Sequence, residues 1–178
     1  MLHRRSVNAP LLALLLLVLA TGCGGPTVPD GIEPVRGFDV DRYMGRWYEI
    51  ARLDHRFERG LEQVTAHYTR RPDGTVEVVN RGFDTQKERW REARGKARFV
   101  GSPDVGALEV SFFGPFYGGY NIVEIDDAYE HVLISGPNRD YLWILARTPQ
   151  ADPATVDRLV ARAASLGFDT DALLRVRH

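Results

Sequence analysis

The feature that most constrains the fold is a series of short β-rich segments that recur about every ten residues between Arg46 and Arg147. β-branched and aromatic residues are frequent in these segments, and glycine, proline, aspartate and asparagine separate them. This rhythm is typical of an antiparallel β-sandwich or β-barrel. We predict eight strands, at residues 46–54, 62–70, 75–82, 89–100, 106–113, 117–125, 130–135 and 141–147.

The alternation of polarity along these strands indicates which faces are buried. In segment 106–113, the apolar residues Leu108, Val110 and Phe112 share one face of the strand. Glu109 and Ser111 lie on the opposite face. Segment 141–147 is apolar on both faces. That pattern is expected of a barrel strand that is covered on its outer side by another element.

A helix is predicted after the last strand. Asp152 is suited to cap a helix that begins at Pro153, and Gly167 is suited to end it. A short extended segment at 173–176 is expected to join a sheet edge. We therefore predict an all-β fold, an eight-stranded up-and-down antiparallel β-barrel with a C-terminal α-helix packed on its wall. The helix would pack through a stripe of Val156, Leu159, Val160, Ala163 and Leu166.

The N-terminus has the composition of an export signal. Arg4 and Arg5 precede an apolar run at 11–20, which is shorter than the roughly 20 apolar residues that span a bilayer. The sequence at 20–23, Ala-Thr-Gly-Cys, resembles the bacterial lipobox, in which the cysteine after the cleavage site is acylated. Cys23 is the single cysteine of the chain, so no disulfide forms within it. The alternative is an ordinary secretory signal with an unrelated cysteine.

These signals divide the chain into three parts. We predict a signal peptide at 1–22, a lipidated cysteine with a flexible tether at 23–37, and one folded domain at 38–178. The tether is inferred from its proline and glycine content. A formal net charge of −1 argues against a nucleic-acid partner.

An up-and-down meander brings three segments to one end of the barrel. The start of the first strand, the turn at 126–129 and the end of the last strand must lie together there. We therefore expect the Arg147 guanidinium to pack over the Trp47 indole and close that end. The alternative is that the two residues are unrelated.

These converging segments carry a resemblance to the lipocalin family. Gly45-x-Trp47 resembles the first lipocalin motif, and Arg147 resembles the arginine of the third. The second motif usually reads Thr-Asp-Tyr, and Asp127 in the Asp-Asp turn is a weaker match. The resemblance covers 38–178. Within the family, this part of the sequence is most similar to the bacterial outer-membrane lipoprotein branch and, more distantly, to apolipoprotein D. It implies structural roles for Gly45, Trp47, Asp127 and Arg147.

The residues predicted to point inward form a mostly apolar lining with two phenols and one amide. Such a lining suits an amphiphile with a small neutral or hydrogen-bonded head. Apart from Arg147, no inward lysine or arginine is expected. The alternative is a filled core without a cavity. The predicted ligand-binding residues are Ala66, Tyr68, Val78, Asn80, Phe99, Val110, Phe112, Tyr120, Trp143 and Leu145.

Segment 113–119 lies at the predicted open end and is unusually aromatic for a loop. It either forms a lip that touches a membrane or a ligand tail, or folds back as a lid. Glu49 is expected on the inner face as a hydrogen-bonded acid, with a catalytic role as the alternative. The histidines have no metal-binding spacing. We expect no cofactor and no metal ion.

The predicted function is the binding, storage or transport of fatty acids or lysophospholipids in the bacterial cell envelope. The resemblance places the protein in the outer membrane, anchored by N-acyl diacylglyceryl Cys23, with the barrel facing the periplasm. Gly24, where an aspartate would commonly hold a lipoprotein at the inner membrane, agrees with that location. A homodimer is left open. The alternatives to a non-enzymatic carrier are a lipid isomerase or esterase on the same scaffold and a structural tether with a filled barrel.

Overall fold

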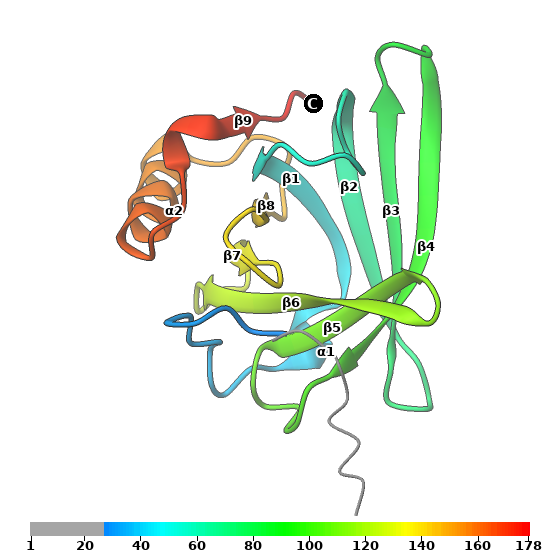
Figure 1. The fold of residues 1–178 in the computed structure, drawn as a ribbon, viewed down its shortest axis with the longest axis vertical. Coiled ribbons are helices and arrows are strands. Elements are labelled where there is room, and N and C mark those ends of the chain that lie inside the picture. The colour runs from blue at the N-terminus through cyan, green and yellow to red at the C-terminus, as the bar shows by residue number, and fades with distance from the viewer. Residues whose placement is uncertain (1–26) are drawn as a thin grey trace, which may run out of the picture.

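The computed structural model describes residues 27–178, which form a β-barrel with one long helix on its outside (Figure 1). The predicted signal peptide and Cys23 lie outside the described residues. The predicted eight strands are present, with ends shifted by only a few residues. The elements are α1 (Val40–Tyr43), β1 (Gly45–Leu53), β2 (Leu61–Arg70), β3 (Val76–Asp84), β4 (Arg89–Phe99), β5 (Ala107–Phe113), β6 (Phe116–Ile125), β7 (His131–Ser135), β8 (Leu142–Ala146), α2 (Pro153–Ser165), a 3-10 turn (Thr170–Ala172) and β9 (Leu173–Arg175).

The barrel closes because β1 pairs with both β8 and β2. Each of β2 to β7 is antiparallel to the next strand along the chain. β1 pairs with β2 only as far as Tyr48. Beyond that point the C-terminal segment fills the wall: Ala51 is opposite Arg175, and the Gln63 amide donates to the Arg177 carbonyl at 2.7 Å. The predicted extended C-terminal segment is therefore part of the barrel wall.

A bulge in β1 changes which residues face inward. The pairing of β1 with β8 shifts register between Glu49 and Ala51. Trp47 packs in the inner core, and Ala51 packs in the outer core under the helix. Because a bulge reverses the alternation, Arg52 becomes a buried side chain with 3% exposure. The prediction that Arg147 would be the one inward-facing cation was therefore wrong.

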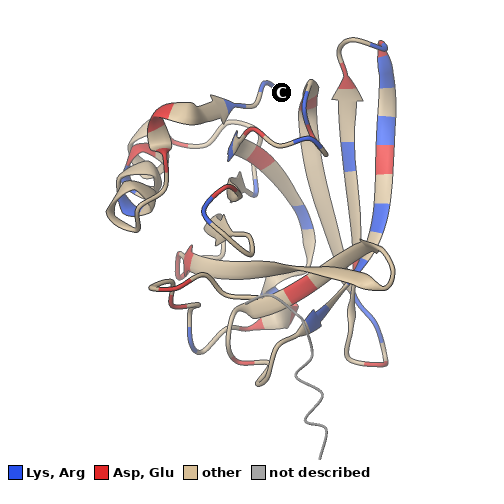
Figure 2. Ribbon diagram, in the orientation of Figure 1, with Lys and Arg blue, Asp and Glu red and all other residues tan. Residues whose placement is uncertain are grey.

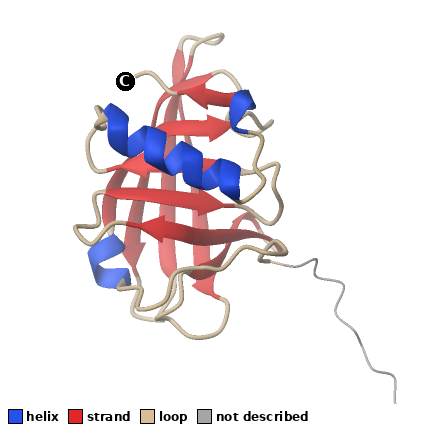
Figure 3. Cartoon of the chain, turned by 90° about the vertical axis from the view of Figure 1, so that its left-hand side faces the viewer, coloured by secondary structure: helices blue, strands red, loops and turns tan. Residues whose placement is uncertain are grey.

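Helix α2 covers the outer face of the barrel wall (Figure 3), on the side opposite the β3–β4 hairpin (Figure 1). The Asp152 carboxylate accepts a hydrogen bond from the Thr155 amide at 3.0 Å, which confirms the predicted N-cap. Val156 and Leu159 are buried in the outer core. β8 is therefore covered on both faces, and this explains its continuous apolar sequence.

The segment predicted as a flexible tether packs against the barrel from Thr27 onward. The Val35 amide donates to the Ile122 carbonyl at 2.9 Å. Ile32 is 5% exposed. The tether was predicted from its proline and glycine content, which gave no weight to these apolar residues. They pack against β6 and the outer core. Within residues 27–178, no helix is both long enough and apolar enough to span a bilayer.

Candidate functional site

The barrel encloses a cavity of about 650 Å³ that is open at one end. Trp47 lies at the closed end, and the opposite end, the mouth, is formed by loops 54–60, 85–88, 114–115 and 136–141. Nine of the ten residues predicted as ligand-binding line this cavity. They are Ala66, Tyr68, Val78, Asn80, Val110, Phe112, Tyr120, Trp143 and Leu145.

Phe99 is the predicted lining residue that the structure places elsewhere. Its ring centroid lies 6.3 Å from that of Phe38, beside the closed end. Phe99 is paired with Leu108 near the end of β4, so it faces inward as predicted. Phe99 packs beside Phe38 and is not among the residues that line the cavity.

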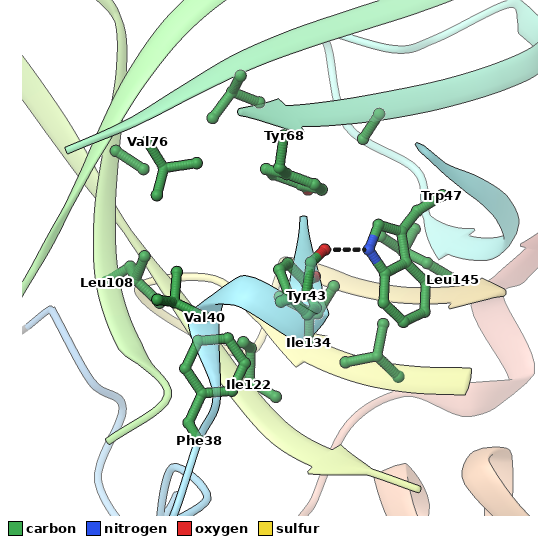
Figure 4. Close-up of a cluster of buried hydrophobic side chains, with 14 of the residues drawn as sticks. Phe38, Val40, Tyr43, Trp47, Tyr68, Val76, Leu108, Ile122, Ile134 and Leu145 are labelled. Carbon is green, nitrogen blue, oxygen red and sulfur yellow. Dashed lines mark hydrogen bonds between the residues drawn. The ribbon is translucent and has the colours of Figure 1, made fainter. Parts of the chain in front are cut away.

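The floor of the cavity is formed by a segment that precedes the first strand. Phe38, Val40 and Tyr43 point into the closed end of the barrel (Figure 4). The Asp39 carboxylate accepts hydrogen bonds from the amides of Asp41 and Arg42 and begins the short helix α1. Sequence reasoning missed this floor because α1 has only four residues. An acid followed by apolar residues at Val40 and Tyr43 was the available signal.

Trp47 and Arg147 are packed together at the closed end, as expected. The guanidinium carbon of Arg147 lies 3.9 Å from the Trp47 ring centroid. The Trp47 indole nitrogen donates to the Tyr43 carbonyl at 2.9 Å (Figure 4). Arg147 donates to the carbonyls of Arg42 at 2.7 Å, Arg46 at 2.9 Å and Tyr129 at 3.1 Å. The arginine therefore joins α1, β1 and the β6–β7 turn.

The β6–β7 turn is held by Asp126 and not by the side chain of Asp127. The Asp126 carboxylate accepts from the amides of Glu130 and His131 at 2.8 and 2.9 Å and lies 2.7 Å from His131 Nδ1. Partial burial raises the pKa of Asp126, but these contacts outweigh it and lower the pKa. Asp127 contributes its carbonyl, which accepts from Arg42 at 2.6 Å. The structural role assigned to Asp127 thus belongs largely to its neighbour.

Three tyrosines meet near the floor of the cavity and form a tyrosine triad. The Tyr120 hydroxyl lies 2.6 Å from that of Tyr43 and 2.7 Å from that of Tyr68. Burial raises the pKa of all three phenols, so they remain neutral. The Tyr120 hydroxyl is therefore bonded to both of its neighbours at the floor of the cavity.

A buried ionisable cluster lies in the wall nearer the mouth and consists of Glu49, Arg52, His55 and Glu58. Arg52 donates to the Glu49 carboxylate at 2.6 Å and to the Glu58 carbonyl at 2.9 Å. Glu58 Oε2 lies 2.9 Å from His55 Nε2 and accepts from the Trp143 indole at 3.0 Å. The sequence prediction missed this cluster because the bulge that turns Arg52 inward has no clear sequence signal.

The two carboxyls of this cluster differ in acidity. Burial raises the pKa of Glu49 well above its usual value, and the negative charge of Glu58 adds to this, while Arg52 opposes it. Burial also raises the pKa of Glu58, but hydrogen bonds from His55 and Trp143 outweigh it and lower the pKa. Glu49 is therefore the less acidic and Glu58 the more acidic carboxyl of the cluster.

The mouth is surrounded by exposed aromatic side chains. Phe113 and Phe116, on either side of the β5–β6 turn, are 71% and 78% exposed, and Phe57 is 48% exposed. These three phenylalanines are called the aromatic lip. Because they face solvent, the β5–β6 segment is a lip and not a closed lid. Arg56 and Arg91 also border the mouth, and Figure 2 shows the charged residues along β4.

Most of the chain is similar to known sequences of one family. Residues 38–178 match the family model described as a Lipocalin-like domain. The chain is 49% identical to the outer membrane lipoprotein Blc of Citrobacter freundii over 165 residues, covering 93% of each chain. It is 50% identical to the protein of that name from Escherichia coli K12, covering 89% of this chain and 90% of the relative. Apolipoprotein D of Rattus norvegicus is 29% identical, covering 83% and 86%.

Solved structures show the same fold at low sequence identity. Insecticyanin from the tobacco hornworm Manduca sexta superposes with a TM-score of 0.67 at 18% identity, covering 86% of this chain and 87% of that protein. The cockroach allergen Per a 4 superposes with a TM-score of 0.66 at 18% identity, covering 85% and 95%.

Proposed function

Because this chain belongs to the lipocalin family, we propose that its barrel binds one amphiphilic lipid, a fatty acid or a lysophospholipid, in the bacterial cell envelope. The observation that carries the proposal is the open cavity of about 650 Å³ with mainly apolar and aromatic walls. This volume falls within the range of about 300–1,000 Å³ that is usual for small-molecule sites.

The distribution of charge supports one orientation of the ligand. At the closed end, the Arg147 guanidinium already contacts three carbonyls and the Trp47 ring. The triad phenols are neutral. A charged head buried there would lose hydration without gaining an ion pair. At the mouth, Arg56 and Arg91 are exposed to water. The Arg56 guanidinium lies over the Phe57 ring, and Arg91 lies 3.7 Å from the Asp84 carboxylate at the same end. We therefore propose that the head group lies at the mouth and that the acyl chain extends between Val78 and Val110 toward the triad.

The N-terminus and the relatives support a proposal for the cellular location. We assign 1–22 as a signal peptide and Cys23 as the acylated residue, with 38–178 as the lipocalin domain. The two relatives at about half identity are named outer membrane lipoproteins. These observations support an outer-membrane lipoprotein whose barrel lies in the periplasm.

The second candidate is an enzyme that acts on the bound lipid. The observation in its favour is Glu49, a buried carboxyl with a raised pKa that lines the same cavity as His55. Perturbed acids of this kind occur in active sites. Here, however, the ionisable groups of the cluster contact one another and Trp143, which favours a structural role. Incubation with oleate and lysophosphatidylethanolamine, followed by mass analysis, distinguishes the two: product formation that Glu49→Gln abolishes would establish the enzyme.

Binding can be tested with a fatty acid that carries a nitroxide quencher. Trp143 lies in the cavity wall, whereas Trp47 lies behind the floor and Trp90 on the outer surface. Titration of delipidated protein should give saturable quenching with one ligand per chain. Trp143→Phe should remove most of this quenching, and Trp90→Phe should not. Quenching that rises linearly without saturation would contradict a specific site.

A further inference from the structure

The described part of the N-terminal segment runs along the barrel wall, and its first residue, Thr27, lies at the mouth half of that wall and not at the closed end. The Thr27 carbonyl accepts a hydrogen bond from the Asn121 side-chain amide at 2.8 Å. Asn121 is fully buried and also donates to the Gly136 carbonyl at 3.2 Å. Gly136 begins the β7–β8 loop, which borders the mouth. Thr27 is therefore tied to the mouth half of the wall.

Two further contacts fix the same segment. Arg139, in the β7–β8 loop, donates to the Asp30 carbonyl at 2.8 Å. On β6, a Cβ atom at Gly119 would lie 1.9 Å from the Thr27 carbonyl oxygen and 3.2 Å from Pro137. The close approach of Thr27 to β6 therefore requires glycine at position 119. Pro137 itself lines the cavity near the mouth.

The distance from this attachment to the acylated cysteine is limited by covalent geometry. Cys23 precedes Thr27 by four residues, which span at most about 14 Å. Phe116 lies three residues from Gly119 along β6, or about 10 Å toward the mouth. Ile125, at the closed end, lies six residues away in the opposite direction, or about 20 Å. The cysteine can reach the level of the aromatic lip, but it cannot reach the level of the closed end.

We propose that the mouth of the barrel is docked on the same bilayer that holds the acyl chains of Cys23. This proposal rests on the acylation of Cys23 given under the proposed function. The docking surface is the aromatic lip, Phe57, Phe113 and Phe116, which enters the lipid interface. Arg56 and Arg91 beside it complement anionic lipid head groups. The occupant of this exposed apolar surface is thus the membrane of the anchor, and a lipid can pass between that membrane and the cavity without detachment of the protein.

A depth measurement tests the docking. Because Cys23 is the single cysteine of the chain and its thiol is used by the lipid, an introduced cysteine can be labelled selectively. At Gly114, the tip of the β5–β6 turn, an added Cβ atom would meet no other atom within 4 Å, so Gly114→Cys leaves the three phenylalanines in place. Ala128→Cys, on the exposed turn of the closed end, is the matched control. Each is made in the full lipidated chain, labelled with a nitroxide and reconstituted in vesicles of phosphatidylethanolamine and phosphatidylglycerol.

Power-saturation measurements then compare collisions with oxygen, which partitions into lipid, and with a nickel chelate, which stays in water. At Gly114→Cys we expect protection from the chelate of about tenfold relative to Ala128→Cys. Adding Phe113→Ser and Phe116→Ser should remove this protection while the protein still floats with the vesicles. A label at position 114 that remains as accessible to the chelate as the label at 128, or a protection that survives both serines, would overturn the docking.

The outcome also separates the docking from the proposed function. If the protein floats with the vesicles but the label at position 114 is accessible to the chelate, the docking is wrong and the lipid anchor stands. If the wild-type chain carries no acyl group and does not float with vesicles, the anchor assigned to Cys23 is wrong, and the docking proposal fails with it. Binding of amphiphiles to the cavity is measured independently by the quenching titration.

Discussion

The Arg147 guanidinium carbon lies 3.9 Å from the centroid of the Trp47 ring, and this contact seals the closed end of the barrel. The indole is fully buried. The guanidinium satisfies three backbone carbonyls from α1, β1 and the β6–β7 turn. The pair therefore combines a cation–π contact with hydrogen bonds that link three segments distant in sequence.

Trp47→Ala should destabilise the fold by about 3–5 kcal/mol, because it removes a large buried side chain and leaves a cavity. Chemical denaturation monitored by circular dichroism measures the change. Trp90→Ala is the matched control, since Trp90 is 45% exposed on the outer surface. A loss below about 1 kcal/mol for Trp47→Ala would contradict its central place in the closed end.

Arg147→Ala should cost less than Trp47→Ala, and most of its effect should depend on Trp47. Arg147→Lys should recover little, because lysine lacks the planar fork that reaches three carbonyls. The double mutant gives the coupling energy, expected to be about 1–2 kcal/mol for a contact shielded from water. Simple additivity of the two single changes would show that the residues act independently.

Tyr120→Phe should destabilise the barrel by about 1–3 kcal/mol, because the buried hydroxyls of Tyr43 and Tyr68 both lose their partner. Tyr117→Phe, at the mouth, is the control. Calorimetry at neutral pH measures both. An equal effect of the two substitutions would mean that the tyrosine triad contributes nothing beyond an ordinary surface phenol.

The raised phenol pKa values also predict a dependence on alkaline pH. The folded protein keeps the triad protons, whereas the unfolded chain loses them above a pH of about 10, the usual tyrosine value. The free energy of unfolding should therefore fall as pH rises beyond that value. In Tyr120→Phe this decline should be shallower. Superimposable profiles above pH 10 would contradict the burial of these phenols.

Most carboxyls in folded proteins have a lowered pKa and make the free energy of unfolding rise with pH. Glu49 should do the opposite. Its pKa is raised above the usual 4.5, so the unfolded chain releases the proton at a lower pH than the folded protein does. The free energy of unfolding should fall as pH rises from about 4.5 through the folded pKa. Glu49→Gln should flatten the profile in this window, and exposed Glu130→Gln should leave it unchanged. A Glu49→Gln profile parallel to that of wild type would mean that Glu49 is already charged in the folded state.

Cys23→Ser should prevent acylation and move the exported protein from the membrane fraction to the soluble periplasm. The reason is that each buried methylene of the acyl chains adds about 0.8 kcal/mol of membrane affinity, far more in total than the lip alone provides. Fractionation with immunodetection measures the change. If the Cys23→Ser protein remains wholly with membranes while residues 27–178 alone do not, residues 1–22 act as an uncleaved anchor.

The parts of the fold that sequence predicted are those with local signals. Turn residues and alternating polarity located the eight strands, and Asp152 with Pro153 located the start of α2. The approach of Trp47 to Arg147 followed from the meander alone, because an up-and-down order determines which segments share an end. Nine of the ten predicted lining residues line the cavity, because side chains alternate regularly between the two faces of β2, β3, β5 and β8.

The features that sequence did not predict depend on contacts between distant residues. The bulge after Glu49 turns Arg52 inward, and only its partners, the Glu49 carboxylate and the Glu58 carbonyl, make that burial tolerable. The packing of Thr27 to Gly37 depends on Gly119 and Asn121, which lie about ninety residues later. Asp126 and Asp127 have the same side chain, so sequence alone does not tell which of them bonds the β6–β7 turn. The geometry of the turn selects Asp126.

The most direct test of lipid binding in the barrel is native mass spectrometry of the Cys23→Ser protein after exposure to oleate or lysophosphatidylethanolamine. An open cavity of this size predicts one bound amphiphile per chain. Val110→Trp, which fills the middle of the cavity, should abolish this adduct, while circular dichroism shows that the barrel is intact. No adduct on the Cys23→Ser protein, or equal adducts with and without Val110→Trp, would contradict the conclusion that the barrel interior is a lipid-binding site.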